Sequence, residues 1–124
     1  MKTNNKLRAA FTLVEIMIVV AIIGLLAAIA IPNFVRARTT AQMNACINNL
    51  RQIDGAIQQW ALETKQASGA TVTHTDVTGY LKAPPTCPAY SGAGGVPGFT
   101  ASYGLTTVSN PPTCAQVATH ILPN

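Results

Sequence analysis

The side chains best suited to chemistry in this sequence are three cysteines, Cys46, Cys87 and Cys114, and two histidines, His74 and His120. Thiolates and imidazoles bind zinc, but zinc-binding sequences usually hold their cysteines in close Cys-x2–4-Cys pairs, and this chain has none. A thiol nucleophile needs a base that is oriented by a third group, and neither histidine completes such a triad with Cys46. We therefore predict no metal site, no cofactor and no enzymatic activity, and we place both histidines on the surface or in loops.

Two of the cysteines are better placed to form a disulfide. Cys87 and Cys114 both lie in Pro- and Gly-rich sequence that has no strong apolar core of its own. A disulfide that closes a loop of this size stabilises a fold by about 3–4 kcal/mol, chiefly by restricting the unfolded chain. Cys46 falls on an apolar helical stripe and is expected to be a free buried thiol. The sequence favours a Cys87–Cys114 disulfide.

Glu15 is the most informative charged residue, because it lies inside the otherwise uncharged stretch of residues 11–31. A carboxylate within a membrane span is costly and usually has a partner. If the chain is cut between Ala10 and Phe11, the new α-amino group of one subunit can neutralise Glu15 of a neighbour and fix the register between them. An interfacial acid or a contact with the helix dipole is the simpler alternative.

The net charge of +4 comes mainly from the first ten residues, which hold Lys2, Lys6 and Arg8. Without them the basic and acidic residues nearly balance, so the chain has no clustered basic face for nucleic acid. Basic residues before an apolar stretch act instead as a topology signal. No acidic residue follows Asp76, so a calcium site built from C-terminal carboxylates is not expected.

A long helix is the element that would position most of these residues. Residues 11–31 form an apolar run that is long enough to cross roughly 30 Å of hydrocarbon. After Pro32 the apolar residues recur on one helical face, at Cys46, Leu50, Ile53, Ile57 and Trp60. We predict one helix from Thr12 to about Thr64, perturbed at Pro32 and stopped by Ser68-Gly69.

The remaining residues predict a small region of short elements. Residues 98–108 and 116–122 are rich in β-branched and aromatic residues and predict two short strands, with loops at 92–98 and 110–112. Thr75-Asp76 predicts the cap of a short helical turn that continues to Leu81. Trp60 and Phe99 are expected to pack this region against the long helix.

These elements define an α+β fold, with a long N-terminal helix packed on a small C-terminal strand-and-loop region. The expected segments are a leader at residues 1–10, a transmembrane and assembly helix at 11–33, an amphipathic periplasmic helix at 34–66 and the C-terminal region at 67–124.

The stretch Ala10-Phe11-Thr12-Leu13-Val14-Glu15, with its basic leader, its aliphatic run, Gly24 and Pro32, resembles the signal of type IV pilins and type II secretion pseudopilins. The resemblance is close over roughly residues 6–36 and weaker along the rest of the helix. It implies a pilin-like fold and a prepilin peptidase that cuts after Ala10 and N-methylates Phe11. The family usually has Gly before the cut, where this chain has Ala10. The resemblance also implies that the helix loses hydrogen bonds between Gly24 and Pro32 on assembly.

The function that the resemblance implies is structural. The chain would be a single-pass protein of the bacterial inner membrane, with its C-terminal part in the periplasm, and an assembly platform would draw it into a homo-oligomeric filament with other pilins or pseudopilins. The small C-terminal region favours a pseudopilin in type II protein secretion. The alternative is a type IV pilin of a surface pilus for adhesion, motility or DNA uptake.

An ordinary secretory signal is the second alternative. Ala28-Ile29-Ala30 has the small-x-small form of a signal-peptidase site and follows an apolar stretch of suitable length. A cut after Ala30 would release a soluble protein that begins at Ile31. This alternative leaves the charge of Glu15 unexplained.

Overall fold

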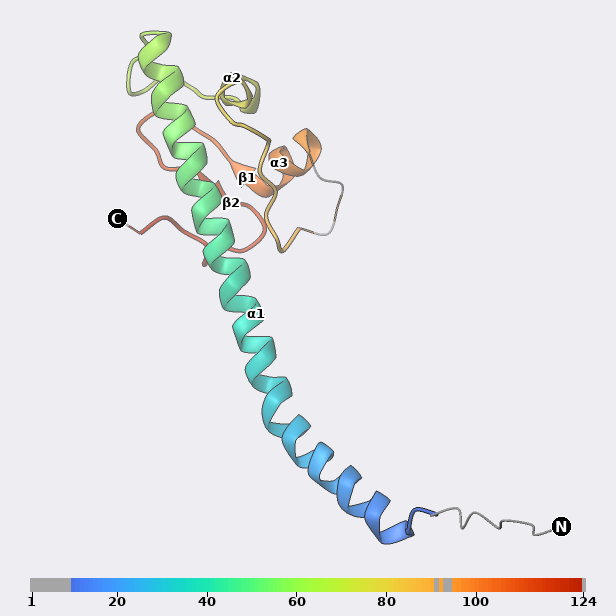
Figure 1. The fold of residues 1–124 in the computed structure, drawn as a ribbon. Helices are drawn as coiled ribbons and strands as arrows, with labels where there is room; N and C mark the ends of the chain where they lie inside the picture. Colours follow the sequence, from blue (N-terminus) through green and yellow to red (C-terminus); the bar gives the residue numbers. More distant parts are fainter. Residues whose placement is uncertain (1–9, 91, 93–94, 124) are drawn as a thin grey trace, which may run out of the picture. The chain divides into compact units, whose positions relative to one another are not determined.

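The computed structural model describes residues 10–90, 92 and 95–123, so nearly all of the predicted leader lies outside the described residues. Figure 1 shows helix α1 (Leu13–Glu63), the short helices α2 (His74–Thr78) and α3 (Val96–Ser102), and the strands β1 (Tyr103–Gly104) and β2 (Thr113–Cys114). The chain divides into two compact units, one that ends at Ala37 and one that begins at Arg38. The α+β class and the long N-terminal helix are confirmed.

Helix α1 has 51 residues and includes Pro32. It ends earlier than Gly69, because the chain takes a left-handed turn at Lys65, where φ is 54°. The N–H of Gln66 donates to the carbonyl of Ala61 at 2.9 Å, and the N–H of Lys65 donates to the carbonyl of Leu62 at 3.4 Å. These two bonds form a Schellman motif, in which the left-handed position is usually Gly. The helix is therefore stopped by hydrogen bonding of its last carbonyls.

One face of α1 supplies half of the core of the C-terminal unit. Its buried residues are Cys46, Leu50, Ile53, Ala56, Ile57 and Ala61, which confirms the predicted stripe. Trp60 is only half-buried, at the edge of this core. The other half of the core comes from the rest of the unit and comprises Val72, Val77, Cys87, Phe99, Tyr103, Val108 and Cys114. Phe99 is fully buried, as predicted.

Polar side chains of α1 also hold the C-terminal region in place. Asn49 Nδ2 donates to the carbonyl of Thr86 at 3.2 Å and to the hydroxyl of Tyr103 at 2.9 Å. Gln58 Nε2 donates to the carbonyl of Val108 at 3.1 Å. Because this region has little regular structure of its own, these bonds satisfy carbonyls that a larger sheet would otherwise pair.

The predicted strands are wrong in extent and position. Helix α3 occupies residues 98–102 of the first segment, and β1 is limited to two residues. Strand β1 pairs antiparallel with β2, with Tyr103 opposite Cys114 and Gly104 opposite Thr113, whereas residues 116–122 form no strand. Phe99 and Tyr103 are both buried and lie four residues apart, a spacing that favours a helical turn over an alternating strand.

The N-cap of the short helix α2 lies two residues before the predicted cap at Thr75. Its N-cap is Thr73, whose backbone N–H donates to Asp76 Oδ2 at 2.9 Å. Hydrogen bonds from the hydroxyl and the N–H of Thr73 hold the pKa of Asp76 below its usual value. The cap is followed by His74, whose Nε2 lies 2.7 Å from the carbonyl oxygen of Tyr103 and whose ring meets Phe99 edge-on at 4.9 Å. Helix α2 is thus tied to the aromatic part of the core.

Candidate functional site

The start of α1 holds Glu15 in a local hydrogen-bond arrangement. The N–H of Thr12 donates to Glu15 Oε2 at 2.8 Å, and the hydroxyl of Thr12 donates to the same oxygen at 2.7 Å. The N–H of Glu15 lies 3.3 Å from the hydroxyl oxygen of Thr12, to which it donates. This reciprocal arrangement is a capping box, in which Thr12 is the cap residue.

The capping box gives Glu15 a role that sequence reasoning missed. The Thr-x-x-Glu spacing of Thr12 and Glu15 was the available signal. This contact corresponds to the simpler alternative for Glu15, in which the acid lies near a helix N-terminus and interacts with the helix dipole. Pairing with the α-amino group of a neighbouring subunit concerns a processed, assembled chain and stays a prediction.

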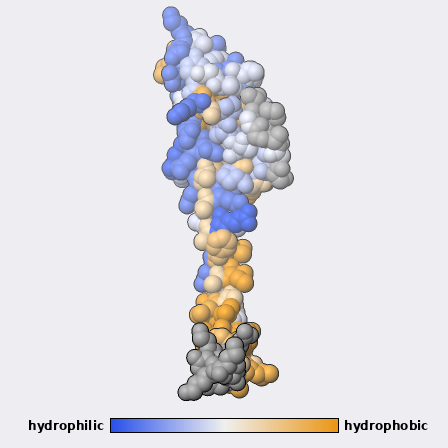
Figure 2. Space-filling view, turned by 45° about the vertical axis from the view of Figure 1, so that its right-hand side comes forward, coloured by the Kyte–Doolittle hydropathy of each residue, from blue (hydrophilic) through white to orange (hydrophobic). Residues whose placement is uncertain are grey.

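The large apolar residues from Phe11 to Val35, on either side of Glu15 in the sequence, are exposed. Phe11 is 83% exposed, and even Val19 is 51% exposed. The visible face of this N-terminal helical segment is orange, the hydrophobic end of the scale, in Figure 2. Helix α1 is long and apolar enough to cross a membrane, and none of its apolar window is buried within the protein. A helix that is apolar all round needs lipid or other protein around it.

Gly24 and Pro32, the two other predicted assembly residues, both lie within α1. A side chain added at Gly24 would meet nothing within 4 Å, so no contact among the described residues requires glycine there. Their part in assembly stays a prediction, as does processing between Ala10 and Phe11.

The C-terminal unit brings together four side chains that are far apart in the sequence: Cys46 of α1, Cys87 of the loop after α2, Cys114 of β2 and His120 of the C-terminal segment. Their potential ligand atoms all lie within 4.8 Å of one another, and all four residues are buried. The prediction of a surface or loop position for His120 is wrong as to exposure, because His120 is only 6% exposed. The juxtaposition of the four was not predicted.

The sulfur atoms of Cys87 and Cys114 lie 3.7 Å apart. A disulfide bond is about 2.05 Å long, so the structure describes these residues, like Cys46, as free buried thiols. The free, buried state agrees with the prediction for Cys46. The Cys87–Cys114 disulfide stays a prediction.

The environment of Cys46 disfavours nucleophilic chemistry. Burial raises the pKa of the Cys46 thiol to about 12. A thiol with that pKa is protonated at neutral pH, and the thiolate is the reactive form. Cys46 is therefore a poor nucleophile in this environment.

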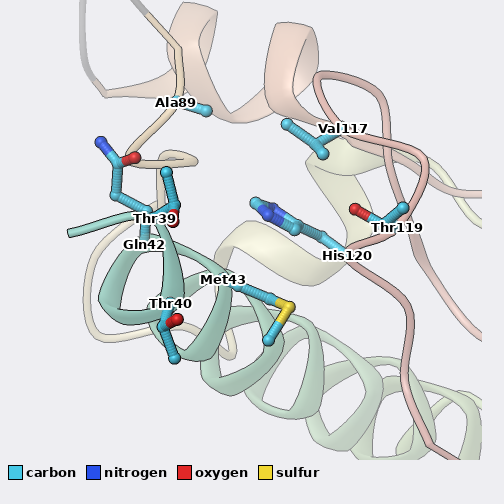
Figure 3. A pocket seen from close by; sticks show the side chains of 8 residues that line it. All are labelled: Thr39, Thr40, Gln42, Met43, Ala89, Val117, Thr119 and His120. Carbon is cyan, nitrogen blue, oxygen red and sulfur yellow. The ribbon is translucent and has the colours of Figure 1, made fainter. Parts of the chain in front are cut away.

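A pocket of about 320 Å³ lies beside this cluster. Figure 3 shows the ring of His120 directed into it. Its lining comprises Thr39, Thr40, Gln42 and Met43 from α1, and Ala89, Val117, Thr119 and His120 from the C-terminal region. Of the four cluster residues, His120 lines this pocket.

Comparison with known proteins identifies the N-terminal segment. Residues 5–31 match the family model of the prokaryotic N-terminal methylation motif. The chain is 49% identical over 49 residues to the type IV major pilin protein PilA of Myxococcus xanthus, which covers 40% of this chain and 22% of that protein. It is 44% identical over 63 residues to the type IV major fimbrial protein FimA of Dichelobacter nodosus, covering 51% of this chain and 40% of that protein.

A fimbrial protein of Pseudomonas aeruginosa is 41% identical over 71 residues, covering 56% of this chain and 46% of that protein. The chain thus spans less than half the length of these three relatives. No solved structure matches it significantly.

Proposed function

Since this chain belongs, by its N-terminal segment, to the type IV pilin family, we propose that it is the structural subunit of a helical filament anchored in the inner membrane. The observation that carries the proposal is the match to the methylation motif at residues 5–31, together with the exposure of the large apolar side chains of α1 between Leu13 and Val35. In the membrane, lipid would cover these side chains, and in the filament the same helices of neighbouring subunits would cover them.

The geometry at the start of α1 is compatible with cleavage in the membrane followed by assembly into a filament. Cleavage after Ala10 by a prepilin peptidase would place a new α-amino group on Phe11, next to the capping box. Both bonds from Thr12 end on Oε2 of Glu15, which, within the described part of the chain, leaves Oε1 for a further donor. A neighbour's α-amino group would be such a donor, and a charged pair in a low dielectric is costly to separate. The pair would set the register of adjacent subunits.

We assign the filament to type II secretion, as a periplasmic pseudopilus. The support is the slight C-terminal region, in which the only strands among the described residues are β1 and β2, each of two residues. A surface pilus is the second candidate, and the observation in its favour is that the matched relatives are named as pilins and fimbrial proteins.

Microscopy and secretion assays in a deletion strain test this proposal. For a pseudopilus, deletion should abolish the release of secreted enzymes and leave surface filaments unchanged. For a surface pilus, filaments should disappear while secretion continues. If neither filaments nor secretion change, and the purified chain never polymerises, the proposal of a filament subunit is wrong.

A further inference from the structure

We propose that Cys46, Cys87, Cys114 and His120 form a structural zinc site that fastens the C-terminal region to α1. The site is independent of the filament function, and it would bind Zn²⁺ through three thiolates and one imidazole nitrogen. This donor set is one of the closed, four-coordinate sets typical of structural zinc.

The first support is geometric. With Zn–S near 2.3 Å and Zn–N near 2.0–2.1 Å, the ligand atoms of a tetrahedral site lie roughly 3.5–3.8 Å apart. The sulfurs of Cys87 and Cys114 are already 3.7 Å apart, and all four ligand atoms lie within 4.8 Å of one another. Contraction by about 1 Å at the longest separation would close the site around the metal ion.

The second support is the state of His120. Its side chain is 94% buried, and its Nδ1 atom has no hydrogen-bond partner in the part of the chain that the structure describes. A buried polar atom without a partner is costly, so it needs an explanation such as an ion. A metal bond to the imidazole would supply one. The pocket in Figure 3, into which the ring is directed, gives the ion a route to the site.

The third support is the way in which the ligand residues are held. The N–H of Cys87 donates to Ser102 Oγ at 3.1 Å, and the N–H of His120 donates to the carbonyl of Val117 at 3.0 Å. Hydrogen bonds around a metal site orient its ligands. Binding of Zn²⁺ would displace the three thiol protons to solvent.

The site also meets a structural need. The C-terminal unit has two strands of two residues each among its described residues, and its four ligands come from α1 and three separate later segments. A zinc ion would link all four at one point. A disulfide between Cys87 and Cys114 would leave Cys46 and His120 unlinked.

Metal analysis of the full chain tests the proposal. The untagged protein, purified in detergent without reductant, should retain about one zinc ion after dialysis. Cys46→Ser and His120→Gln should each weaken zinc binding by at least about 100-fold, because loss of an outer-shell partner alone costs 10–100-fold. His74→Gln is the matched control, since His74 lies outside the cluster, and it should bind zinc as the parent does. Equal zinc binding by all of these proteins would overturn the proposal.

Two measurements on the unmodified protein avoid any effect of the variants on folding. Co²⁺ should give the visible absorption of a tetrahedral thiolate site. Alkylation of all three cysteines should become fast when a chelator is added, with no reductant present. If Cys87 and Cys114 react only after a reductant is added, and no zinc is found, they form a disulfide and the zinc site does not exist.

Discussion

The two units of the chain differ in the exposure of their apolar side chains. In the unit that ends at Ala37, large aliphatic side chains such as Leu25 and Ile29 are 66% and 62% exposed. In the unit that begins at Arg38, Leu50 and Phe99 have no exposed surface. The first unit depends on surroundings outside the chain, which we assign to lipid and neighbouring subunits. The second has its own core, but that core is small and is supported by few strand hydrogen bonds.

The polar groups of the two units also differ in exposure. Glu15 is exposed, and among the described residues its carboxylate bonds to Thr12, so it remains available to another chain. The thiols and His120 are buried and face one another across segments that are distant in sequence. Substitutions in the first unit should therefore affect assembly, and substitutions in the second should affect folding.

The largest expected effect is on assembly. Glu15→Gln keeps an oxygen acceptor for the capping box but removes the charge, so membrane insertion should continue while filament formation is lost. Thr12→Ala is the matched control, because it removes the cap hydroxyl and keeps the charge, and filaments should still form. Electron microscopy of filaments from both strains measures the effect. Normal filaments with Glu15→Gln would show that the charge pair is not needed.

The next effect tests whether the core of the second unit is self-sufficient. Leu50→Ala should lower the free energy of unfolding by about 2–5 kcal/mol, because it leaves a cavity among fully buried neighbours. Denaturant unfolding can be followed by the fluorescence of Trp60, the only tryptophan in the chain. Leu26→Ala, at a site that is 61% exposed, should leave this transition unchanged. A similar loss from both substitutions would contradict the separation of the two units.

A smaller effect is expected where α1 ends. Lys65→Gly should raise the free energy of unfolding by about 1 kcal/mol, because glycine adopts the left-handed conformation without the clash of a Cβ atom. Lys65→Ala keeps the Cβ atom and should bring no comparable gain. The same fluorescence transition measures both. Stabilisation by alanine as large as that by glycine would show that the gain comes from removing the lysine side chain.

The smallest effect concerns the cap of α2. Asp76 is partly exposed, and its pKa is lowered by hydrogen bonds from the hydroxyl and N–H of Thr73. Its contribution to stability is complete above the unfolded pKa of about 3.9 and is lost as the pH falls through the lower folded value. Asp76→Ala should therefore cost about 0.5 kcal/mol at neutral pH, with a smaller difference from the parent below pH ~3. A difference that does not change with pH would exclude this linkage.

Features encoded by neighbouring residues could be predicted from the sequence. The limits of α1 and the buried stripe of Cys46, Leu50, Ile53 and Ile57 follow from helical periodicity, which depends on local spacing alone. The prepilin-type segment is also continuous, and its match to a family model was therefore predictable. Local signals were also overlooked, since Thr12-x-x-Glu15 and Thr73-x-x-Asp76 both have capping-box spacing.

Features that depend on tertiary packing could not be predicted in this way. The segment that contains Phe99 has weak strand propensity, but its packing against His74 and Tyr103 favours a helix. His120 lies in a short tail of mixed polar and apolar residues, in which no periodicity marks the histidine as buried. The cluster joins residues 46, 87, 114 and 120, and no spacing rule for zinc ligands covers such separations. The only local sign was a histidine six residues after Cys114.

The most direct measurement of the central claim is the mass of the N-terminal peptide of the protein isolated from cell membranes. A prepilin processed between Ala10 and Phe11 should yield a peptide that begins with N-methylated Phe11. A peptide that begins with Ile31, as an ordinary signal-peptidase cut would produce, would contradict the assignment of this chain as a filament subunit.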